Sequence, residues 1–197
     1  MSRRRAVVAT RNQHKLRELG EIVVSLELAP LPDTVQLPSE DGDTFADNAL
    51  AKARAAHSAT GLAALADDSG IVARALGGRP GVHSARYAGP DASDEENLEL
   101  LLRELAGAGD RSVAYVCALA FVDEGGAERL FEGRCEGELA LEPRGEGGFG
   151  YDPAFIPADT GPADRRTMAE LSAAEKHAIS HRGRAAAKLV RWLETER

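Results

Sequence analysis

The chain has 197 residues, of which 43% are hydrophobic and 28% charged, the balance of an ordinary globular protein. A chain of this length buries roughly 70% of the surface of its unfolded form, so it needs neither disulfides nor a structural metal to fold. We therefore expect one domain over residues 1–197. The formal net charge of −8 argues against a nucleic-acid or anionic-membrane binder, because the surface as a whole repels polyanions.

The lack of a recognisable targeting signal and the small number of cysteines lead us to expect a cytoplasmic protein. No apolar run approaches the roughly 20 residues that span a bilayer, and the stretch before Thr10 lacks the apolar core of a signal peptide. We expect a protein that contacts neither nucleic acid nor membrane. Cys117 and Cys135 are predicted to be buried free thiols, as is usual in a reducing compartment.

The first half of the chain alternates strands and helices. A short β-branched run predicts a strand at 5–9, and apolar residues at helical spacing predict a helix at 12–24. A second helix is predicted at 44–60, where Thr44 and Asp47 resemble a capping box. Its apolar face consists mainly of alanines, which predicts close packing against a neighbouring element.

The second half adds more helices and a hairpin. A capping box opens a predicted helix at 93–105, and two apolar runs at 112–122 and 127–135 flank a glycine turn, which predicts an antiparallel hairpin. A further helical pattern covers 172–192, with a break at 180–183. The sequence therefore predicts an α/β fold with a mixed sheet.

A polar and basic segment lies where the first strand meets the first helix. Its residues are Thr10, Arg11, Asn12, Gln13, His14 and Lys15. Free backbone N–H groups and the positive end of the helix dipole favour phosphate binding at such a junction, and Lys15 adds a cation. The alternative is a simple helix cap at Asn12 with solvated neighbours. A Walker A loop is excluded, because its glycine spacing is absent.

Two acidic segments are candidates for a metal site. Asp67 and Asp68 follow a predicted strand at 62–66, and adjacent carboxylates there raise each other's pKa unless a cation lies between them. Mg²⁺ prefers such oxygen ligands together with water and phosphate. We expect Glu40 and Asp68 to be its ligands, with Asp41 or Asp67 as alternatives for the second position. A helix cap and a glycine turn are the structural alternatives.

A glycine-rich segment at 145–153 matches the pattern G-x-G-x-x-G, but no helix opens at its last glycine, which excludes a dinucleotide-binding turn. Such a loop can instead bring backbone close to a flat ring while an aromatic side chain covers the face of the ring. Phe149, Tyr151 and Asp152 are its candidate residues. The alternative is a bulged turn between strands.

Basic residues gather near the carboxyl-terminal helical pattern. His177 and His181 have the spacing of a zinc motif, but no glutamate base lies between them, which argues against zinc. Lys176, His181 and Arg182 can surround an anionic or oxygen-bearing ligand, or else form a solvated helix face. No nucleophile elbow is present, and neither cysteine has a plausible base partner.

Taken together, these segments resemble the inosine triphosphate pyrophosphatase (Ham1-like) family. The matching segments run in register at 9–15, 40–45, 48–53, 66–70, 80–81, 84–87, 147–153 and 180–183. The resemblance covers nearly the whole chain, and Arg11 is one departure, since many members carry a small residue there. It implies an elongated α/β fold around a long mixed sheet, with a substrate cleft between two lobes.

The resemblance also implies residue roles. Thr10 to Lys15 would hold a triphosphate, Ser69 would touch substrate, Asp68 would accept a proton, and Glu40 and Asp68 would bind Mg²⁺. The residues expected around the base are Phe149, Gly150, Tyr151, Asp152, Lys176, His181 and Arg182. Bacterial members are homodimers that cleave inosine, deoxyinosine and xanthosine triphosphates (ITP, dITP and XTP) to the monophosphate and pyrophosphate.

The implied chemistry agrees with the residues. Water attack on the α-phosphorus needs alignment and charge neutralisation, which a metal, a helix N-terminus and Lys15 can provide. Selectivity would arise at the purine 6-position, where hypoxanthine and xanthine carry an oxygen acceptor and adenine an amino donor. The competing functions are a Maf-like pyrophosphatase acting on other nucleotides and a non-catalytic nucleotide sensor.

Overall fold

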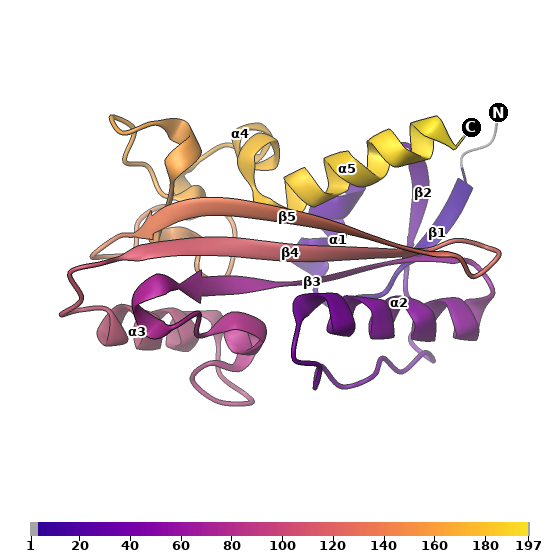
Figure 1. Ribbon diagram of the computed structural model, residues 1–197, viewed down its shortest axis with the longest axis horizontal. Coiled ribbons are helices and arrows are strands. Elements are labelled where there is room, and N and C mark those ends of the chain that lie inside the picture. Colours follow the sequence, from indigo (N-terminus) through magenta and orange to yellow (C-terminus); the bar gives the residue numbers. More distant parts are fainter. Residues whose placement is uncertain (1–3, 197) are drawn as a thin grey trace. The chain divides into compact units, whose positions relative to one another are not determined.

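The computed structural model describes residues 4–196, so the first three residues and the last residue of the predicted domain lie outside the described residues. A mixed six-stranded sheet has the strand order β2-β1-β3-β4-β5-β6, with helices beside it (Figure 1). The strands are β1 (Arg4–Val8), β2 (Leu26–Pro30), β3 (Ala63–Ala73), β4 (Ser112–Val122), β5 (Glu128–Leu139) and β6 (Phe155–Pro157). The α-helices are α1 (Gln13–Ile22), α2 (Phe45–Thr60), α3 (Asp94–Glu104), α4 (Ala173–Ile179) and α5 (His181–Thr195). The predicted α/β class and mixed sheet are confirmed.

The chain divides into two compact units. Unit 1 comprises residues 4–68, 117–133 and 182–196, and unit 2 comprises residues 69–116 and 134–181. The strands β3, β4 and β5 each contribute residues to both units. Among residues 4–196, every helix is too short or too polar to cross a bilayer.

Unit 1 is organised by the two faces of β1, which pairs in parallel with β2 and β3. Val7 packs in a cluster with the alanines of α2, whereas Val8, on the opposite face, packs with Leu19 of α1 and Leu189 of α5. This alternation follows from the two-residue period of a strand. The alanine face of α2 is fully buried, so its predicted close packing is confirmed.

Unit 2 has a core of its own, built on α3. Leu98, Leu101 and Leu105 form one cluster with Tyr115 of β4 and Phe155 of β6. The short β6 pairs antiparallel with the end of β5, which is why β5 continues to Leu139, beyond the predicted 127–135.

Helix ends were predicted well because their signals are local. Asn12 and Thr44 cap α1 and α2 with their side-chain oxygens, and capping boxes at Ser93 and Ser172 open α3 and α4. Ser180 has extended backbone and separates α4 from α5, so the predicted break is present but is confined to Ser180, since residues 181–183 already belong to α5. Both cysteines are buried and neither is in a disulfide within residues 4–196, as expected.

The predicted end of β3 was wrong. The strand continues through Asp67 and Asp68 to Ala73, so the aspartates lie inside it. What ends there is β1: Val8, its last residue, pairs with Leu65. The glycine turn considered for this segment is also excluded. Gly70 lies in the strand, where an added Cβ would be 2.7 Å from the carbonyl oxygen of Gly81.

Candidate active site

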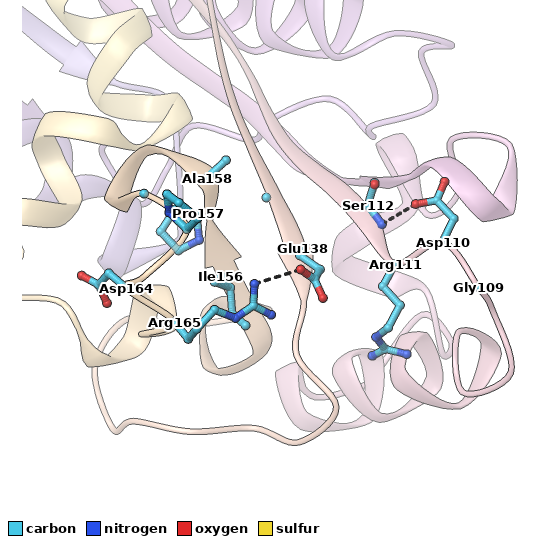
Figure 2. A pocket seen from close by; sticks show the side chains of 13 residues that line it. Gly109, Asp110, Arg111, Ser112, Glu138, Ile156, Pro157, Ala158, Asp164 and Arg165 are labelled. Atoms are coloured by element: carbon cyan, nitrogen blue, oxygen red, sulfur yellow. Dashed lines mark hydrogen bonds and ion pairs between the residues drawn. The ribbon is translucent and has the colours of Figure 1, made fainter.

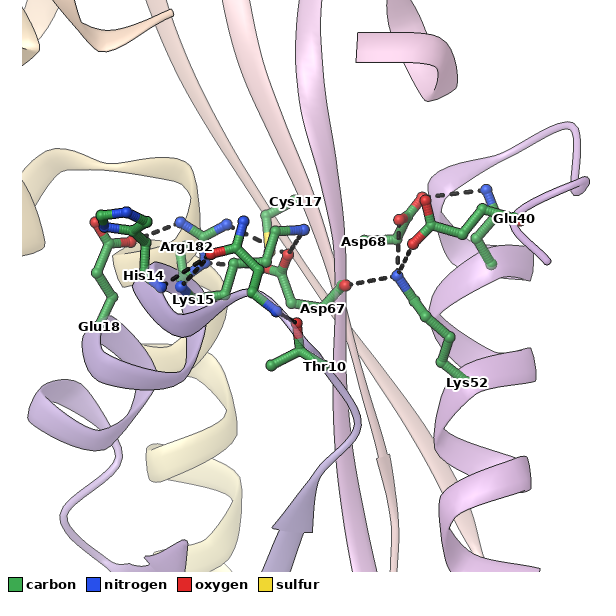
Figure 3. A network of polar contacts seen from close by, with 12 residues as sticks. Thr10, His14, Lys15, Glu18, Glu40, Lys52, Asp67, Asp68, Cys117 and Arg182 are labelled. Carbon is green, nitrogen blue, oxygen red and sulfur yellow. Dashed lines mark hydrogen bonds and ion pairs between the residues drawn. The ribbon is translucent and has the colours of Figure 1, made fainter. Parts of the chain in front are cut away.

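Glu40 and Asp68 share one ammonium group in unit 1 (Figure 3). Lys52 Nζ lies 2.5 Å from Glu40 Oε1 and 2.9 Å from Asp68 Oδ1. It also donates to the backbone oxygen of Asp67 at 2.9 Å. Asn48, one turn earlier on α2, donates to Asp68 Oδ2 at 3.1 Å. The helix thus aims one cation and one amide at the carboxylate predicted to accept a proton.

Burial and charge act differently on the two carboxylates. Burial tends to raise the pKa of Glu40, but the charge and hydrogen bond of Lys52 outweigh it, so that pKa is lowered. Burial also raises the pKa of Asp68, and the negative charge of Glu40 adds to this rise, which Lys52 offsets only in part. The pKa of Asp68 is therefore shifted upward from its ordinary value, and that of Glu40 downward.

The pair also fits a divalent cation. Among residues 4–196, no three His, Cys, Asp or Glu side chains are grouped so that they could hold a metal by themselves. Glu40 and Asp68 do converge on one positive charge, that of Lys52. Mg²⁺ is commonly bound by one or two carboxylates together with water and substrate phosphate, so two oxygen ligands are sufficient.

Asp67 belongs to a second network, on the other side of β3. Its side chain is completely buried and receives Lys15 Nζ at 2.6 Å, Arg182 Nε at 3.0 Å and the thiol of Cys117 at 3.1 Å. Burial alone would raise the pKa of Asp67, but Arg182 and Lys15 hold it well below its usual range. Arg182 also pairs with Glu18 at 2.6 Å. Asp67 is thus already neutralised by two cations.

The segment between β1 and α1 forms a tight cap. Asn12 Oδ1 accepts from the backbone N–H groups of His14 and Lys15 at 2.9 and 3.2 Å, so the cap at Asn12 is confirmed. Thr10 Oγ1 accepts from the Asn12 N–H at 3.1 Å. Arg11 turns away from the helix end, and its guanidinium donates to four backbone oxygens, those of Leu31, Pro32, Asp33 and Val35.

In unit 2, Asp152 is the centre of a third cluster. Lys176 Nζ lies 2.7 Å from Asp152 Oδ2, and the backbone N–H of Phe149 donates to the same oxygen at 2.9 Å. The ammonium of Lys176 is 5.0 Å from the centroid of the Phe149 ring, a cation–π contact. Tyr115 donates to Asp152 Oδ1 at 3.0 Å and stacks on His181.

The glycine-rich loop makes further hydrogen bonds to the rest of unit 2, one of them from the Gly147 N–H to the backbone oxygen of Ala169 at 3.0 Å. Tyr151 donates its hydroxyl to the backbone oxygen of Ser84 at 2.7 Å, and Asp94 accepts the N–H of Gly150 at 2.8 Å. Only a single 3₁₀ turn follows at Asp152–Ala154, so the exclusion of a dinucleotide-binding turn is confirmed.

The predicted site residues therefore fall into two groups. The group in unit 1 comprises Thr10, Arg11, Asn12, Gln13, His14, Lys15, Glu40, Asp68 and Arg182. The group in unit 2 comprises Ser69, Phe149, Gly150, Tyr151, Asp152, Lys176 and His181. Arg182 was grouped with Lys176 and His181 because the three are close in sequence. The structure instead pairs it with Asp67 and Glu18.

Sequence reasoning missed Asn48, Lys52 and Tyr115. A signal was available for the first two, because they are four residues apart and interrupt the alanine face of α2. Polar residues on a buried helix face usually have partners. Tyr115 sits in an apolar strand and gave no such signal.

A separate cavity of about 570 Å³ lies in unit 2, lined by residues 109–112, 137–138, 156–158 and 161–165 except 163 (Figure 2). An ion pair between Arg165 and Glu138, 3.0 Å long, lies within its lining. None of the residues predicted for substrate or metal lines this cavity. The candidate active-site groups are therefore distinct from it.

Comparison with known proteins identifies the family to which the chain belongs. The model of the Ham1 family matches residues 6–192. A dITP/XTP pyrophosphatase of Symbiobacterium thermophilum is 49% identical over 98% of this chain and 96% of its own length. A dITP/XTP pyrophosphatase of Mycobacterium tuberculosis is 51% identical over 93% of this chain and 92% of its own length.

Solved structures agree as well. The Ham1 protein of Staphylococcus aureus has a TM-score of 0.87 and is 37% identical, covering 98% of this chain and 100% of its own. A HAM1 protein of Coxiella burnetii has a TM-score of 0.85 and is 44% identical over the same shares. The expected fold and family are confirmed, and the chain belongs to the Ham1 family.

Proposed function

We propose that this chain hydrolyses dITP, ITP and XTP to the corresponding monophosphate and pyrophosphate. The observation that carries the proposal is the cluster of Asp68, Glu40 and Lys52, in which two carboxylates and an ammonium meet beside the Lys15 network. Relatives named dITP/XTP pyrophosphatases, about half identical over nearly the whole chain, support the substrate class.

Glu40 and Asp68 would hold the metal, which we propose is Mg²⁺. When bound, it would neutralise phosphate charge and lower the pKa of water. Asp68 accepts the proton of the water that attacks the α-phosphorus, and its raised pKa suits this task. Lys15, at the N-terminus of α1, pairs with phosphate charge as pyrophosphate leaves. Thr10, Asn12, Gln13 and His14 would supply the surrounding polar groups, and Arg11 would join them only by leaving its backbone acceptors at residues 31–35.

The Asp152 cluster is proposed to recognise the base. Phe149 would cover the face of the purine ring, and Lys176 and His181 would donate hydrogen bonds to its 6-oxygen. Adenine presents an amino donor there, which would leave these donors unpaired and lower kcat/KM by orders of magnitude. Gly150, Tyr151 and Ser69 would complete the contacts. Arg182 would join them only by leaving Asp67 or Glu18.

We also propose that residues 1–197 act as one domain, since a single family model extends over both units. The family resemblance further implies a homodimer, which analytical ultracentrifugation would test. The substrates are nucleotides of the cell's own pool, so we place the protein in the cytoplasm.

A nucleotide panel tests the proposed function. The purified protein is incubated with Mg²⁺ and, separately, ITP, dITP, XTP, GTP, ATP and pyrimidine triphosphates, and the products are resolved by ion-exchange chromatography. We expect monophosphate and pyrophosphate from ITP, dITP and XTP. Preference for other nucleotides would favour a Maf-like pyrophosphatase. Nucleotide binding without any product would favour a sensor.

A further inference from the structure

Tyr115 of β4 connects two of the residues proposed to recognise the base. Its hydroxyl donates to Asp152 Oδ1 at 3.0 Å. Its ring stacks on His181, with the ring centroids 4.6 Å apart and the planes 16° apart. The side chain is buried, as are Asp152 and His181. Tyr115 itself belongs to a regular strand, so its position is fixed by the sheet.

The ring of Tyr115 stacks with a second ring. Phe155 stacks on it with a centroid distance of 4.4 Å and an interplanar angle of 29°. Tyr115 therefore stacks with both Phe155 and His181. Offset stacking of this kind stabilises a defined ring orientation. Because Phe155 belongs to the core of unit 2, the stack extends from that core to the imidazole of His181.

The hydroxyl of Tyr115 adds a hydrogen bond to the second carboxylate oxygen of Asp152. One oxygen of Asp152 accepts from Lys176 and from the Phe149 backbone, and the other accepts from Tyr115. A carboxylate that is held at both oxygens has little freedom to rotate about its terminal torsion. The position of the Lys176 ammonium, 2.7 Å from Asp152, therefore depends on a hydrogen-bond donor in strand β4.

We propose that Tyr115 is a positioning residue for base recognition, which orients Lys176 through Asp152 by its hydroxyl and orients His181 by its ring. This inference rests on the proposed function, because it assigns Lys176 and His181 to the purine 6-oxygen. Tyr115 touches these residues, and its effect on the base passes through them. It therefore acts on specificity and KM more than on the rate of the chemical step.

The test compares Tyr115→Phe with Tyr87→Phe. Tyr87 is the matched control, since it also lies in unit 2 and its hydroxyl bonds to Glu104 and Arg79 rather than to Asp152. We expect Tyr115→Phe to raise KM for dITP about tenfold, with kcat within about twofold of the parent, and to lower the preference for dITP over dATP. Tyr87→Phe should leave KM, kcat and the preference for dITP over dATP unchanged. Thermal melting checks that both variants fold.

A double-mutant cycle with Asp152→Asn separates positioning from general destabilisation. If Tyr115 acts through Asp152, Tyr115→Phe adds little to KM once Asp152→Asn is present. Additive effects, or an unchanged KM in Tyr115→Phe, would overturn the inference.

The outcome is separable from that of the proposed function. A parent that releases no pyrophosphate from dITP refutes the proposed function. Calorimetric binding of inosine monophosphate then replaces KM, with the same weakening by about tenfold expected for Tyr115→Phe and none for Tyr87→Phe. Unchanged binding would overturn the role of Tyr115 in that case too.

Discussion

Arg182 binds both carboxylate oxygens of Asp67, with Nε 3.0 Å from Oδ2 and Nη2 3.3 Å from Oδ1. This two-point contact joins α5 to β3 within unit 1, and both side chains are buried. Arg182 thus has a structural role in unit 1, because it holds Asp67, the ion-pair partner of Lys15, in place. This role does not depend on any contact between Arg182 and substrate.

Arg182→Ala should therefore destabilise the fold. The buried Asp67 and the half-buried Glu18 would each lose Arg182 as partner, and breaking such pairs lowers the free energy of unfolding by roughly 3–5 kcal/mol. Urea unfolding followed by circular dichroism measures the change. Arg191→Ala, at an exposed position of the same helix, is the control and should have little effect. Equal stabilities for the two variants would show that the Asp67 contact is not structural.

Lys52→Met should expose the repulsion between Glu40 and Asp68. Without the shared ammonium, the free energy of unfolding should fall by roughly 3–5 kcal/mol, because Asp68 is a buried charge left without its main partner. Added Mg²⁺ should restore more stability to Lys52→Met than to the parent, since it can take the position between the carboxylates. Lys188→Met, an exposed lysine on α5, is the control. The same response to Mg²⁺ in all three proteins would argue against a metal at Glu40 and Asp68.

Gly148→Ala should weaken base recognition specifically. Gly148 has φ +73°, and an added Cβ would lie 2.8 Å from Asp152 Cγ, so the carboxylate must move. Gly161 has φ +87° and open space around it, which makes Gly161→Ala the matched control for backbone strain. Each variant should lose roughly 1–2 kcal/mol of stability from strain. Only Gly148→Ala should raise KM for dITP, and a similar rise in Gly161→Ala would show that strain alone is responsible.

Asp68→Asn should nearly abolish turnover while the protein remains folded. Asparagine keeps the shape and can still accept from Lys52, but it cannot take a proton from water, so kcat should fall by about 10²–10⁴-fold. Asp91→Asn, an exposed acid, should retain the parent rate. Initial rates at saturating dITP give kcat for the parent and for both variants. Equal kcat values for Asp68→Asn and the parent would remove Asp68 from the proton transfer.

Features with local causes could be predicted from the sequence. The caps at Asn12, Thr44, Ser93 and Ser172 depend on residues three or fewer positions away, and all are present. The alanine face of α2 likewise identified a buried helix. These local signals are sufficient to predict which segments are helices and which are strands, and the order in which they follow along the chain.

Features with distant causes could not be predicted. The length of β3 depends on its pairing with neighbouring strands, whereas the local apolar run ends at Ala66. The partners of Arg182 are 115 and 164 positions away in the chain, although Lys176 and His181 are nearby in sequence. Tyr115 and Asp152 meet only because β4 and the glycine-rich loop pack together. Their roles become visible only when the fold is known.

Hydrolysis of dITP in water enriched in ¹⁸O tests most directly whether water is activated for attack on the α-phosphorus. The products are separated and analysed by mass spectrometry. If Asp68 deprotonates a water that attacks the α-phosphorus, the heavy oxygen appears in deoxyinosine monophosphate and the pyrophosphate is unlabelled. Label in pyrophosphate with an unlabelled monophosphate, or release of diphosphate and inorganic phosphate, would contradict this mechanism.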